Sequence, residues 1–283
     1  MIDALITGAG GFLGRAITAR LQREHMTVLP LTSSNGDIAD AVTWKHLPPA
    51  RAVVHLAGRS YVPDSWTDGP AFVRANVLGT EQALAYCRRH GASMVLAGAY
   101  VYGVPRRLPI SESHPAAPNN PYALSKLMAE ELCGFASRAQ GIAATALRMF
   151  NVYGPGQRPE FLIPSIVRQV LEGREVRVLS LTPRRDYVFL DDVVDAFVRT
   201  LKPSVGFRCF NIGSGASHSV SEAIAVVQRA AGTSLPVYCD SVERPQEIPD
   251  TVADIGLAEA LLGWRPLWSF EDGIRRIVEG KGL

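Results

Sequence analysis

A glycine-rich turn directly after the first apolar run constrains this chain more than any other feature. The segment LITGAGGFLG places Gly8, Gly11 and Gly14 three residues apart, between the apolar run and an amphipathic helical pattern. Glycine permits a tight bend, a close approach of the backbone to a ligand and close packing of helix on strand. The amides at the start of such a helix attract phosphate. The sequence therefore predicts a dinucleotide-binding turn rather than a plain tight bend.

Short apolar runs alternate with helical patterns through the first half of the chain. The runs are bounded by turns and lack strict alternation, which is typical of parallel strands covered on both faces. This order predicts an α/β fold with a doubly wound parallel sheet of the Rossmann type. Strands are expected at Ala4–Thr7, Thr27–Leu31, Ala52–Ala57, Ser93–Gly98 and Ala143–Arg148, and helices at Phe12–Glu24, Pro70–His90 and Tyr122–Gln140.

The pattern changes after residue 150. A loop rich in Gly and Pro is followed by short strands and by helical patterns at Leu162–Glu172, Asp191–Leu201 and Ser219–Ala231. The last third is rich in proline and isolated charges. We expect residues 1–150 to form the dinucleotide-binding domain, and residues 151–283 to form mainly a smaller C-terminal substrate-binding lobe with some segments returning to the sheet.

Composition argues against several other classes of protein. Lys and Arg number 29 against 27 Asp and Glu, so charge gives no reason to expect a nucleic-acid or membrane partner. No apolar stretch approaches the ~20 residues of a membrane span, and no signal peptide is evident. The 4 cysteines lie far apart and the 6 histidines form no cluster. We therefore expect no metal site, and reduced thiols in a cytoplasmic enzyme.

The residues after the second predicted strand bear on the choice between NAD and NADP. Enzymes that bind NAD usually carry an Asp or Glu about 20 residues after the glycines, which holds the ribose hydroxyls. Thr32, Ser33 and Ser34 stand there instead. Small hydroxyls tolerate a 2′-phosphate, whereas a carboxylate repels it. Arg15, the residue after the last glycine of the turn, could supply a positive charge to the phosphate. NADP is favoured on these grounds, and NAD stays open.

A series of motifs gives the whole chain a resemblance to a known family. They are TGAGGFLG, GDI, HLAG, NVLGT, VYG and NPYALSK, followed by LRMFNVYGPGQ, RRDYVFLDDVVDA, RPQEI and LGWRP. In this order they make the chain resemble an extended short-chain dehydrogenase/reductase. The later motifs are similar to the branch that modifies nucleotide sugars, which includes epimerases, 4,6-dehydratases and 4-ketoreductases. The resemblance implies a nucleotide-sugar substrate.

The same resemblance implies roles for the residues that match its motifs. Asp37 and Ile38 would frame the adenine, and Asn76 would order the nicotinamide side. The expected cofactor contacts are Gly8, Gly11, Phe12, Leu13, Gly14, Arg15, Thr32, Asp37, Ile38, Leu56, Ala57, Gly58, Asn76, Tyr122, Lys126 and Phe150. The expected contacts with the diphosphate and ribose of the sugar nucleotide are Asn151, Arg185 and Arg244. Arginine suits that task because its planar fork binds phosphate through two hydrogen bonds.

Relatives of this kind usually pair as homodimers through two helices. The corresponding helices here are Pro70–His90 and Tyr122–Gln140. Apolar residues that could form the contact face, or equally the core, are Leu78, Leu84, Leu127 and Leu132. A homodimer is therefore expected.

Tyr122 and Lys126 are the expected catalytic pair. They stand four residues apart, so both project from one face of the predicted helix. A free tyrosine titrates near ~10 and is a poor base at neutral pH. The neighbouring ammonium, together with an oxidised nicotinamide, is expected to lower the pKa of Tyr122 and make it a general acid and base.

One expected member of the site is absent from the sequence. The family normally places a Ser or Thr three residues before the Val of VYG, hydrogen-bonded to the reacting sugar oxygen, and Gly98 stands there. Loss of one positioned hydrogen bond costs ~10²–10³ in rate. We therefore expect slower turnover rather than none, and Gly98→Ser is expected to raise the rate if the missing hydroxyl matters. Dehydration is disfavoured, because Ala99 and Tyr100 replace the Asp-Glu pair of the dehydratases.

Three functions fit these observations. The first is an NAD(P)-dependent nucleotide-sugar 4-epimerase that acts through a transient 4-keto intermediate, with Tyr122 as acid and base. The second is an NADPH-dependent 4-ketoreductase of a nucleotide-linked 4-keto-6-deoxyhexose, which uses the same residues in one direction. The third is a cofactor-binding protein with weak or no turnover, which Gly98 alone supports.

Overall fold

The computed structural model describes residues 1–202, 205–241 and 247–280 of the 283-residue chain. The chain divides into two compact units, each assembled from separate stretches of sequence. The first unit comprises residues 1–103, 115–149 and 194–210, and the second comprises residues 104–114, 150–193 and 211–283.

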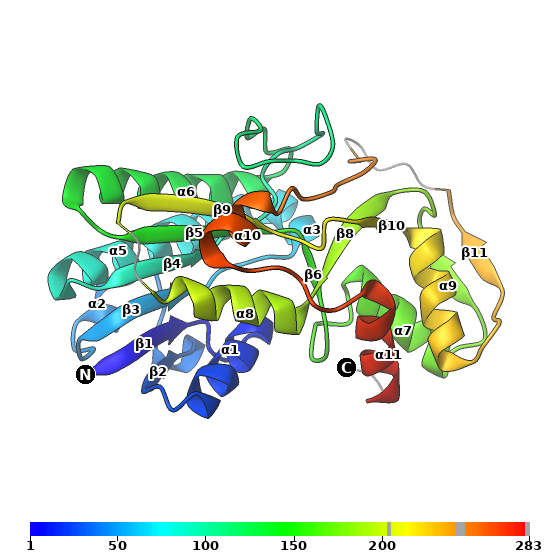
Figure 1. Cartoon of the computed structure of the whole chain (residues 1–283), viewed down its shortest axis with the longest axis horizontal. Coiled ribbons are helices and arrows are strands. Elements are labelled where there is room, and N and C mark those ends of the chain that lie inside the picture. The colour runs from blue at the N-terminus through cyan, green and yellow to red at the C-terminus, as the bar shows by residue number, and fades with distance from the viewer. Residues whose placement is uncertain (203–204, 242–246, 281–283) are drawn as a thin grey trace. The chain divides into compact units, whose positions relative to one another are not determined.

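The first unit is built on a six-stranded sheet in the order β2-β1-β3-β4-β5-β9 (Figure 1). The pairs β1–β2, β1–β3, β3–β4 and β4–β5 are parallel. The strands are β1 (Ile2–Thr7), β2 (Val28–Leu31), β3 (Ala50–His55), β4 (Ser93–Ala97), β5 (Ala144–Met149) and β9 (Phe207–Ile212), the last of which runs on into the second unit. The predicted doubly wound sheet is confirmed, and the predicted strands of the first half match these within a few residues.

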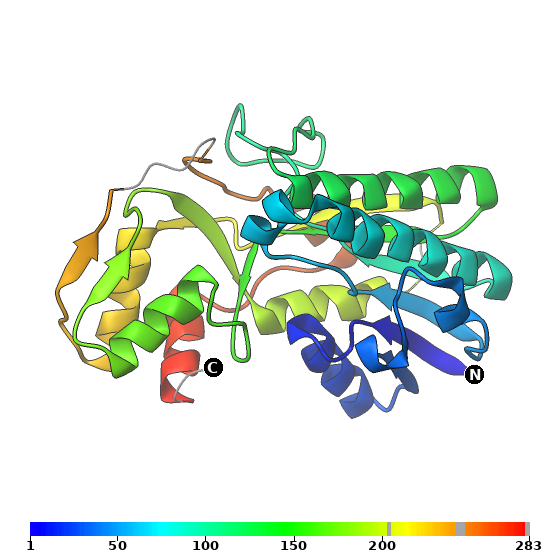
Figure 2. The same cartoon turned by 180° about the vertical axis from the view of Figure 1, so that it is seen from behind.

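Helices cover both faces of this sheet. From β1 the chain moves along the sheet in one direction to β2, and from β3 it moves in the other direction to β4 and β5. Right-handed crossovers therefore place α1 on the face opposite α5 and α6, as the two views in Figures 1 and 2 show. The helical segments of the first unit are α1 (Phe12–Arg23), η1 (Ser33–Asn35), α2 (Ala41–Trp44), α3 (Val62–Thr67), α4 (Gly69–Phe72), η2 (Val73–Leu78), α5 (Gly79–His90), α6 (Pro121–Gln140) and most of α8 (Leu190–Thr200).

Apolar side chains from the sheet and from α5 and α6 form the core of the first unit. Members that are at most 2% exposed include Leu5, Val53, Leu84, Met94 and Ala129. The predicted helix Pro70–His90 is divided here, because η2 inserts a stretch of π-helix between α4 and α5. Such widened turns often mark functional sites.

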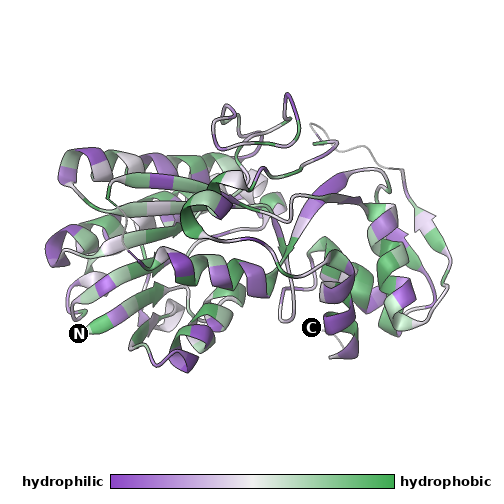
Figure 3. Ribbon diagram, in the orientation of Figure 1, coloured by the Kyte–Doolittle hydropathy of each residue, from purple (hydrophilic) through white to green (hydrophobic). Residues whose placement is uncertain are grey.

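The described part of the second unit contains two small sheets and four whole helices. One sheet is β10-β8-β6, with β6 parallel and β10 antiparallel to β8, and the other is the parallel pair β11–β7. Purple and green alternate along α8 and α11 in Figure 3, as expected for helices with one apolar face. The elements are β6 (Asn151–Tyr153), α7 (Leu162–Glu172), β7 (Val176–Val178), β8 (Arg184–Phe189), β10 (Ser217–Ser219), α9 (Val220–Ala231), β11 (Val237–Cys239), α10 (Gly256–Leu262) and α11 (Phe270–Glu279).

A separate core holds the second unit together. It includes Tyr153, Ile166, Phe189, Ile224 and Ile274, all of them buried. Helices α7, α9 and α11 supply most of its apolar side chains. Among the helices that the structure describes, none has the length and apolarity needed to cross a membrane.

Candidate cofactor and proton-transfer site

The glycine turn between β1 and α1 leaves no room for larger residues at two positions. Gly8 has φ +67°, and a Cβ there would lie 2.8 Å from the backbone nitrogen of Ala57. A Cβ on Gly14 would lie 2.2 Å from the carbonyl oxygen of Gly8. Helix α1 begins after Gly11, which offers no side-chain cap to its first amides. The turn therefore leaves those amides for an anion, and its residues fit the pyrophosphate of a dinucleotide.

Thr7 joins the carboxyl ends of β1 and β3. Its Oγ1 accepts hydrogen bonds from the amides of Leu56 and Ala57, both at 3.1 Å, and lies 2.8 Å from Nδ1 of His55. The sheet order reverses between these two strands, and ligands of open α/β sheets bind at such a point. The predicted contacts at Leu56, Ala57 and Gly58 therefore stand beside the glycine turn, at the edge where a cofactor is expected.

The predicted adenine contact Asp37 is held in an ion pair. Its carboxylate accepts from the Ala39 amide at 2.9 Å and from Nε of Arg74 at 2.9 Å, and both hydrogen bonds lower its pKa. Arg74 also donates to Asp40 at 2.6 Å. Ile38 is half-buried, and its carbonyl accepts from the Trp44 indole at 3.0 Å. Arg74 was not among the predicted site residues, because 37 positions separate it from Asp37.

Asn76 lies in η2 and uses its amide group within the protein. Its oxygen accepts from the Arg59 amide at 2.8 Å, and its nitrogen donates to the Arg59 carbonyl at 3.0 Å and to Oγ of Ser125 at 2.8 Å. Ser125 in turn donates to the carbonyl of Tyr122 at 2.7 Å. Asn76 thereby ties the segment after β3 to the first turn of α6. Its predicted role on the nicotinamide side stays a prediction.

Helix α6 presents the expected catalytic pair from its first turns. Oδ1 of Asn120 caps the helix by accepting from the Ala123 amide at 2.8 Å, and Pro121 occupies the first helical position. Lys126 is buried and Tyr122 is half-buried. The Phe72 ring meets the Tyr122 ring edge-on, with centroids 6.3 Å apart. The cap and this ring contact hold the start of α6 in one geometry.

Burial governs the titration of both members of the pair. It raises the pKa of Tyr122 to about 12 and lowers the pKa of Lys126 to about 8. In the protein without cofactor, burial of the phenolate therefore raises the pKa of Tyr122 rather than lowering it. The combined effect of Lys126 and an oxidised nicotinamide on this pKa stays a prediction. At neutral pH the pair is a protonated tyrosine beside a protonated lysine.

Gly98 packs against the backbone of the adjacent strand. A Cβ there would lie 2.8 Å from the carbonyl oxygen of Leu147 and 3.4 Å from Cα of Arg148. The direction of that Cβ leads into β5, so the position has no room for the hydroxyl that the family pattern places there. The Tyr100 hydroxyl does not replace it, since it donates to the Gly103 carbonyl at 2.6 Å.

The structure reverses the expected outcome of restoring the hydroxyl. Gly98→Ser and Gly98→Ala should each destabilise the protein by about 1–3 kcal/mol, because the added atoms overpack the contact with β5. Denaturant unfolding followed by circular dichroism measures this loss, with Gly69→Ala as the control, since a Cβ on Gly69 would meet nothing within 4 Å and Gly69, like Gly98, has no positive φ. A Gly98→Ser protein of unchanged stability and higher turnover would restore the original expectation.

A buried ion pair between α6 and β5 was not predicted from the sequence. Glu130 of α6 accepts from Nε of Arg148 at 2.9 Å and from its Nη2 at 2.5 Å, while Nη1 donates to the Tyr102 hydroxyl at 2.9 Å. Burial by itself would lower the pKa of Arg148, but hydrogen bonds to Glu130 raise it. The pair fastens α6 to β5 and to the VYG segment. Glu130 lies four residues after Lys126, on the same face of the helix. A carboxylate on that face was the sequence signal that could have indicated a buried partner of opposite charge.

These residues occur in a chain that also matches a known family along most of its length. Residues 4–213 match the model of the family described as NAD dependent epimerase/dehydratase. The chain belongs to the NAD-dependent epimerase/dehydratase family. The predicted family resemblance and the predicted class of NAD(P)-dependent enzyme are thereby confirmed.

Curated relatives of this epimerase/dehydratase include enzymes of two reaction types. GDP-6-deoxy-D-mannose reductase of Pseudomonas aeruginosa is 30% identical over 295 residues, which cover 96% of this chain and 95% of that protein. A UDP-glucose 4-epimerase of Mycolicibacterium smegmatis is 30% identical over 311 residues, covering 97% of each chain.

Solved structures with the same fold include complexes with both cofactors. MoeE5 in complex with UDP-glucuronic acid and NAD superposes with a TM-score of 0.90 at 30% identity, covering 99% of this chain and 98% of MoeE5. RMD from Pseudomonas aeruginosa complexed with NADPH superposes with a TM-score of 0.89 at 29% identity, covering 99% of this chain and 97% of RMD. An NAD(P) cofactor is consistent with both complexes.

Two of the predicted substrate contacts of the epimerase/dehydratase, Asn151 and Arg185, lie in its second unit. Arg185 donates to the Ile248 carbonyl at 2.6 Å and forms an ion pair with Glu247. The Asn151 amide donates to the Asp186 carbonyl at 3.3 Å. Phe150, a predicted cofactor contact, is buried in this unit, where its amide donates to the Ile212 carbonyl at 2.9 Å. Arg244 lies outside the described residues.

Asp186, next to Arg185, organises the same unit from a buried position. Its carboxylate accepts from the amide and the hydroxyl of Ser214 at 2.6 and 2.7 Å, and from the amides of Gly215 and Ala253 at 3.0 and 2.9 Å. Burial nevertheless raises its pKa. Asp186 was missed in the sequence because its four donors come from two distant segments.

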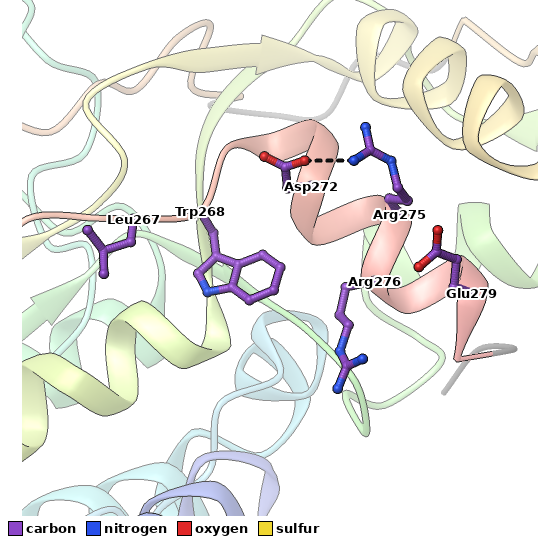
Figure 4. A pocket seen from close by; sticks show the side chains of 6 residues that line it. All are labelled: Leu267, Trp268, Asp272, Arg275, Arg276 and Glu279. Carbon is purple, nitrogen blue, oxygen red and sulfur yellow. Dashed lines mark hydrogen bonds and ion pairs between the residues drawn. The ribbon is translucent and has the colours of Figure 1, made fainter.

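A surface pocket of about 400 Å³ in the second unit contains none of the predicted site residues (Figure 4). Asp272 and Arg275 form an ion pair of 2.9 Å along α11, and the Trp268 ring stands beside them. The residues that line the pocket are Leu267, Trp268, Asp272, Arg275, Arg276 and Glu279. The residues of the family motifs that are predicted to bind cofactor or substrate therefore do not line this pocket.

Proposed function

We propose that this epimerase/dehydratase transfers hydride between a nicotinamide cofactor and carbon 4 of a nucleotide-linked sugar, while Tyr122 exchanges a proton with the oxygen on that carbon. The observation that carries the proposal is the placement of Tyr122 and the buried Lys126 four residues apart in the first turns of α6. Hydrogen bonds from Asn76 through Ser125 hold this turn beside the segment that follows β3. The names of the relatives support a nucleotide-sugar substrate.

The pKa values of Tyr122 and Lys126 suit donation of a proton from Tyr122 to the substrate. A bound nicotinamide supplies or accepts the hydride. With a pKa of about 12, Tyr122 keeps its proton at neutral pH and can donate it to a carbonyl oxygen. The Lys126 ammonium then stabilises the phenolate that donation leaves behind. In the opposite direction Tyr122 must first lose its proton, which requires more positive charge near the ring than Lys126 provides alone.

Two net reactions use these residues. In 4-epimerisation, Tyr122 removes the proton of the 4-hydroxyl and returns it after the keto sugar has turned over, and the UDP-glucose 4-epimerase relative supports this reaction. In 4-ketoreduction, Tyr122 donates a proton once and the cofactor leaves oxidised. The raised pKa of Tyr122 and the similarity to GDP-6-deoxy-D-mannose reductase favour this second candidate.

Incubation with nucleotide-linked hexoses and 4-keto-6-deoxyhexoses, each with NAD(H) and NADP(H), tests the proposal. An epimerase inverts the configuration at carbon 4, seen by NMR, without net change in the absorbance of reduced nicotinamide. A reductase oxidises the reduced nicotinamide, so the absorbance falls in step with the loss of the keto sugar. A protein that binds cofactor but changes no sugar in the panel would instead be the binding protein of the third hypothesis.

The rate in the reducing direction should decline as pH rises above about 8. Lys126 has a pKa of about 8, so its ammonium predominates below that pH and is lost above it. Without the ammonium, the phenolate formed on Tyr122 loses its stabilising charge. A pH profile of kcat/KM measures the decline, and Lys126→Arg, which stays charged, should move it to higher pH. An identical decline in the Lys126→Arg variant would assign it to another group.

A homodimer through α5 and α6 is part of the proposal. Leu84 is 2% exposed and belongs to the core, which is the alternative that the sequence left open for this position. Leu127 and Leu132 are half-buried, whereas Leu78 is exposed. The exposed apolar residues of α6 extend this face.

Phe135→Glu should weaken such a dimer. Leu124, Met128 and Phe135 are 48%, 40% and 57% exposed, and their spacing places them on one side of α6. Loss of a buried aromatic at each side of the interface should raise the dimer dissociation constant by roughly 10–100-fold. Analytical ultracentrifugation across a range of concentrations measures this. A wild-type protein that stays monomeric would rule out the dimer itself.

A further inference from the structure

We infer that Arg59 recognises an acidic group on the sugar, and that the preferred substrate is a nucleotide-linked uronate whose carboxylate the Arg59 guanidinium binds. The inference deepens the proposed function and rests on its proton exchange between Tyr122 and the oxygen on carbon 4. It concerns the group at carbon 5, and an acidic substrate would exclude the 6-deoxyhexose of the second candidate reaction. All the residues that carry it belong to the first unit.

The backbone of Arg59 is fixed to the first turn of α6. Its amide donates to Oδ1 of Asn76 at 2.8 Å, and its carbonyl accepts from Nδ2 of Asn76 at 3.0 Å. The same Nδ2 donates to Oγ of Ser125 at 2.8 Å, and Ser125 donates to the Tyr122 carbonyl at 2.7 Å. Arg59 also follows the carboxyl end of β3, the edge at which open α/β sheets bind ligands. Its place relative to Tyr122 is therefore set by a short chain of hydrogen bonds.

The Arg59 side chain returns to Tyr122 by a second route. Its Cζ lies over the Phe72 ring, 5.7 Å from the centroid, and the same ring meets the Tyr122 ring edge-on. Phe72 is 1% exposed, whereas the Arg59 side chain is 48% exposed. One buried ring therefore separates Tyr122 from a guanidinium that solvent and a ligand can reach.

One edge of this guanidinium is available for an anion. Nη1 of Arg59 donates to Oδ2 of Asp68 at 2.9 Å, and within the described ranges Nε and Nη2 have no hydrogen-bond partner. These two nitrogens point their N–H groups in one direction. Arg148 uses the same edge to hold both carboxylate oxygens of Glu130, at 2.9 and 2.5 Å. The open edge of Arg59 thus has the shape that binds a carboxylate through two hydrogen bonds.

Asp68 orients the guanidinium without occupying that edge. Its Oδ1 accepts from the Ala71 amide at 3.3 Å and so caps α4, while its Oδ2 accepts from Nη1 of Arg59. Both oxygens of Asp68 therefore have donors, and the guanidinium offsets its charge. The ion pair and the Phe72 ring hold Arg59 in place before a substrate arrives, which reduces the entropy that binding would otherwise cost.

The geometry of a pyranose identifies the group that meets Arg59. Carbons 1 and 4 lie at opposite ends of the ring, so a diphosphate on carbon 1 points away from the end that meets Tyr122. The substituent of carbon 5 is next to carbon 4, and in a uronate it is a carboxylate. A neutral hexose carries a hydroxymethyl group there, whose single oxygen cannot accept both N–H groups of the Arg59 edge in parallel. Arg59 therefore favours the acid over the neutral sugar.

Calorimetric titration of the full chain tests the inference, with NADH or NADPH bound so that no hydride can leave the sugar. The matched pairs are UDP-glucuronate with UDP-glucose, and GDP-mannuronate with GDP-mannose. In at least one pair the acid should bind roughly tenfold or more tightly, because a charged pair of hydrogen bonds replaces a neutral one. Arg59→Gln should reduce this advantage to within about twofold. Arg59→Lys keeps the charge without the two-pronged edge and should retain only part of it.

Arg51→Gln is the matched control. Arg51 is another exposed arginine of the first unit whose Nη1 pairs with an aspartate, Asp3, at 3.2 Å, and its loss should leave the preference for the acid unchanged. Equal binding of acid and neutral sugar by the wild type, binding of none of the four probes, or a full preference kept by Arg59→Gln would each overturn the inference. A weaker affinity of Arg59→Gln for NADH or NADPH themselves would assign the guanidinium to the cofactor instead. Preference for the acid without turnover of any sugar would contradict the proposed function alone, and turnover of neutral sugars without that preference would contradict this inference alone.

Discussion

Tyr122→Phe should lower turnover by roughly 10²–10⁴-fold, because the substitution removes the group that donates the proton. The phenylalanine ring retains the edge-on contact with Phe72 at 6.3 Å, and the helix cap at Asn120 is untouched. Folding and cofactor binding should therefore survive. The loss should fall on kcat and kcat/KM together, as expected when an interaction is made only in the transition state.

Tyr100→Phe is the matched control for this loss. Tyr100 is also half-buried, and its hydroxyl donates to the Gly103 carbonyl at 2.6 Å rather than standing free for a substrate. Its removal should leave kcat within about threefold, the size of effect that follows from one neutral hydrogen bond. Single-turnover measurements with saturating cofactor compare the two variants. Full activity of Tyr122→Phe would exclude this residue as the proton donor, and a large loss in Tyr100→Phe would identify a second one.

The glycine turn and the strand order were predictable because their signals are local. Gly8 and Gly14 mark a turn whose geometry follows from a few neighbouring residues, and the apolar runs identify the strands on either side. The division of the predicted helix Pro70–His90 was not visible, since the pattern of apolar residues continues through η2. The π-helical turn contains Asn76, whose hydrogen-bond partners Arg59 and Ser125 lie 17 and 49 residues away in the sequence.

The electrostatics of the site could not be read from spacing alone. The four-residue spacing of Tyr122 and Lys126 predicts that they share a helix face, but not how much water reaches them. Burial by the surrounding protein reverses the expected direction of the Tyr122 pKa. The packing around Gly98 could not be predicted from the sequence either, because the carbonyl that excludes a side chain there belongs to Leu147, on the neighbouring strand.

Glu130→Ala should destabilise the protein by about 3–5 kcal/mol, the cost of leaving one member of a buried ion pair without its partner. Both carboxylate oxygens of Glu130 bond the Arg148 guanidinium, and the side chains of the two residues are 5% and 10% exposed. The Tyr102 hydroxyl remains near Arg148, but it carries no charge to balance the guanidinium.

Glu131→Ala is the control for this substitution, since Glu131 is the next residue of α6 and is exposed. Denaturant unfolding should place the control within about 0.5 kcal/mol of the wild type. The double variant Glu130→Leu with Arg148→Met should recover much of the loss, because it removes both buried charges and fills their volume with apolar atoms. A double variant no more stable than Glu130→Ala would mean that the site needs the geometry of the pair rather than the balance of its charges. An unchanged stability of Glu130→Ala itself would mean that α6, and with it Tyr122, is held to β5 by apolar packing alone.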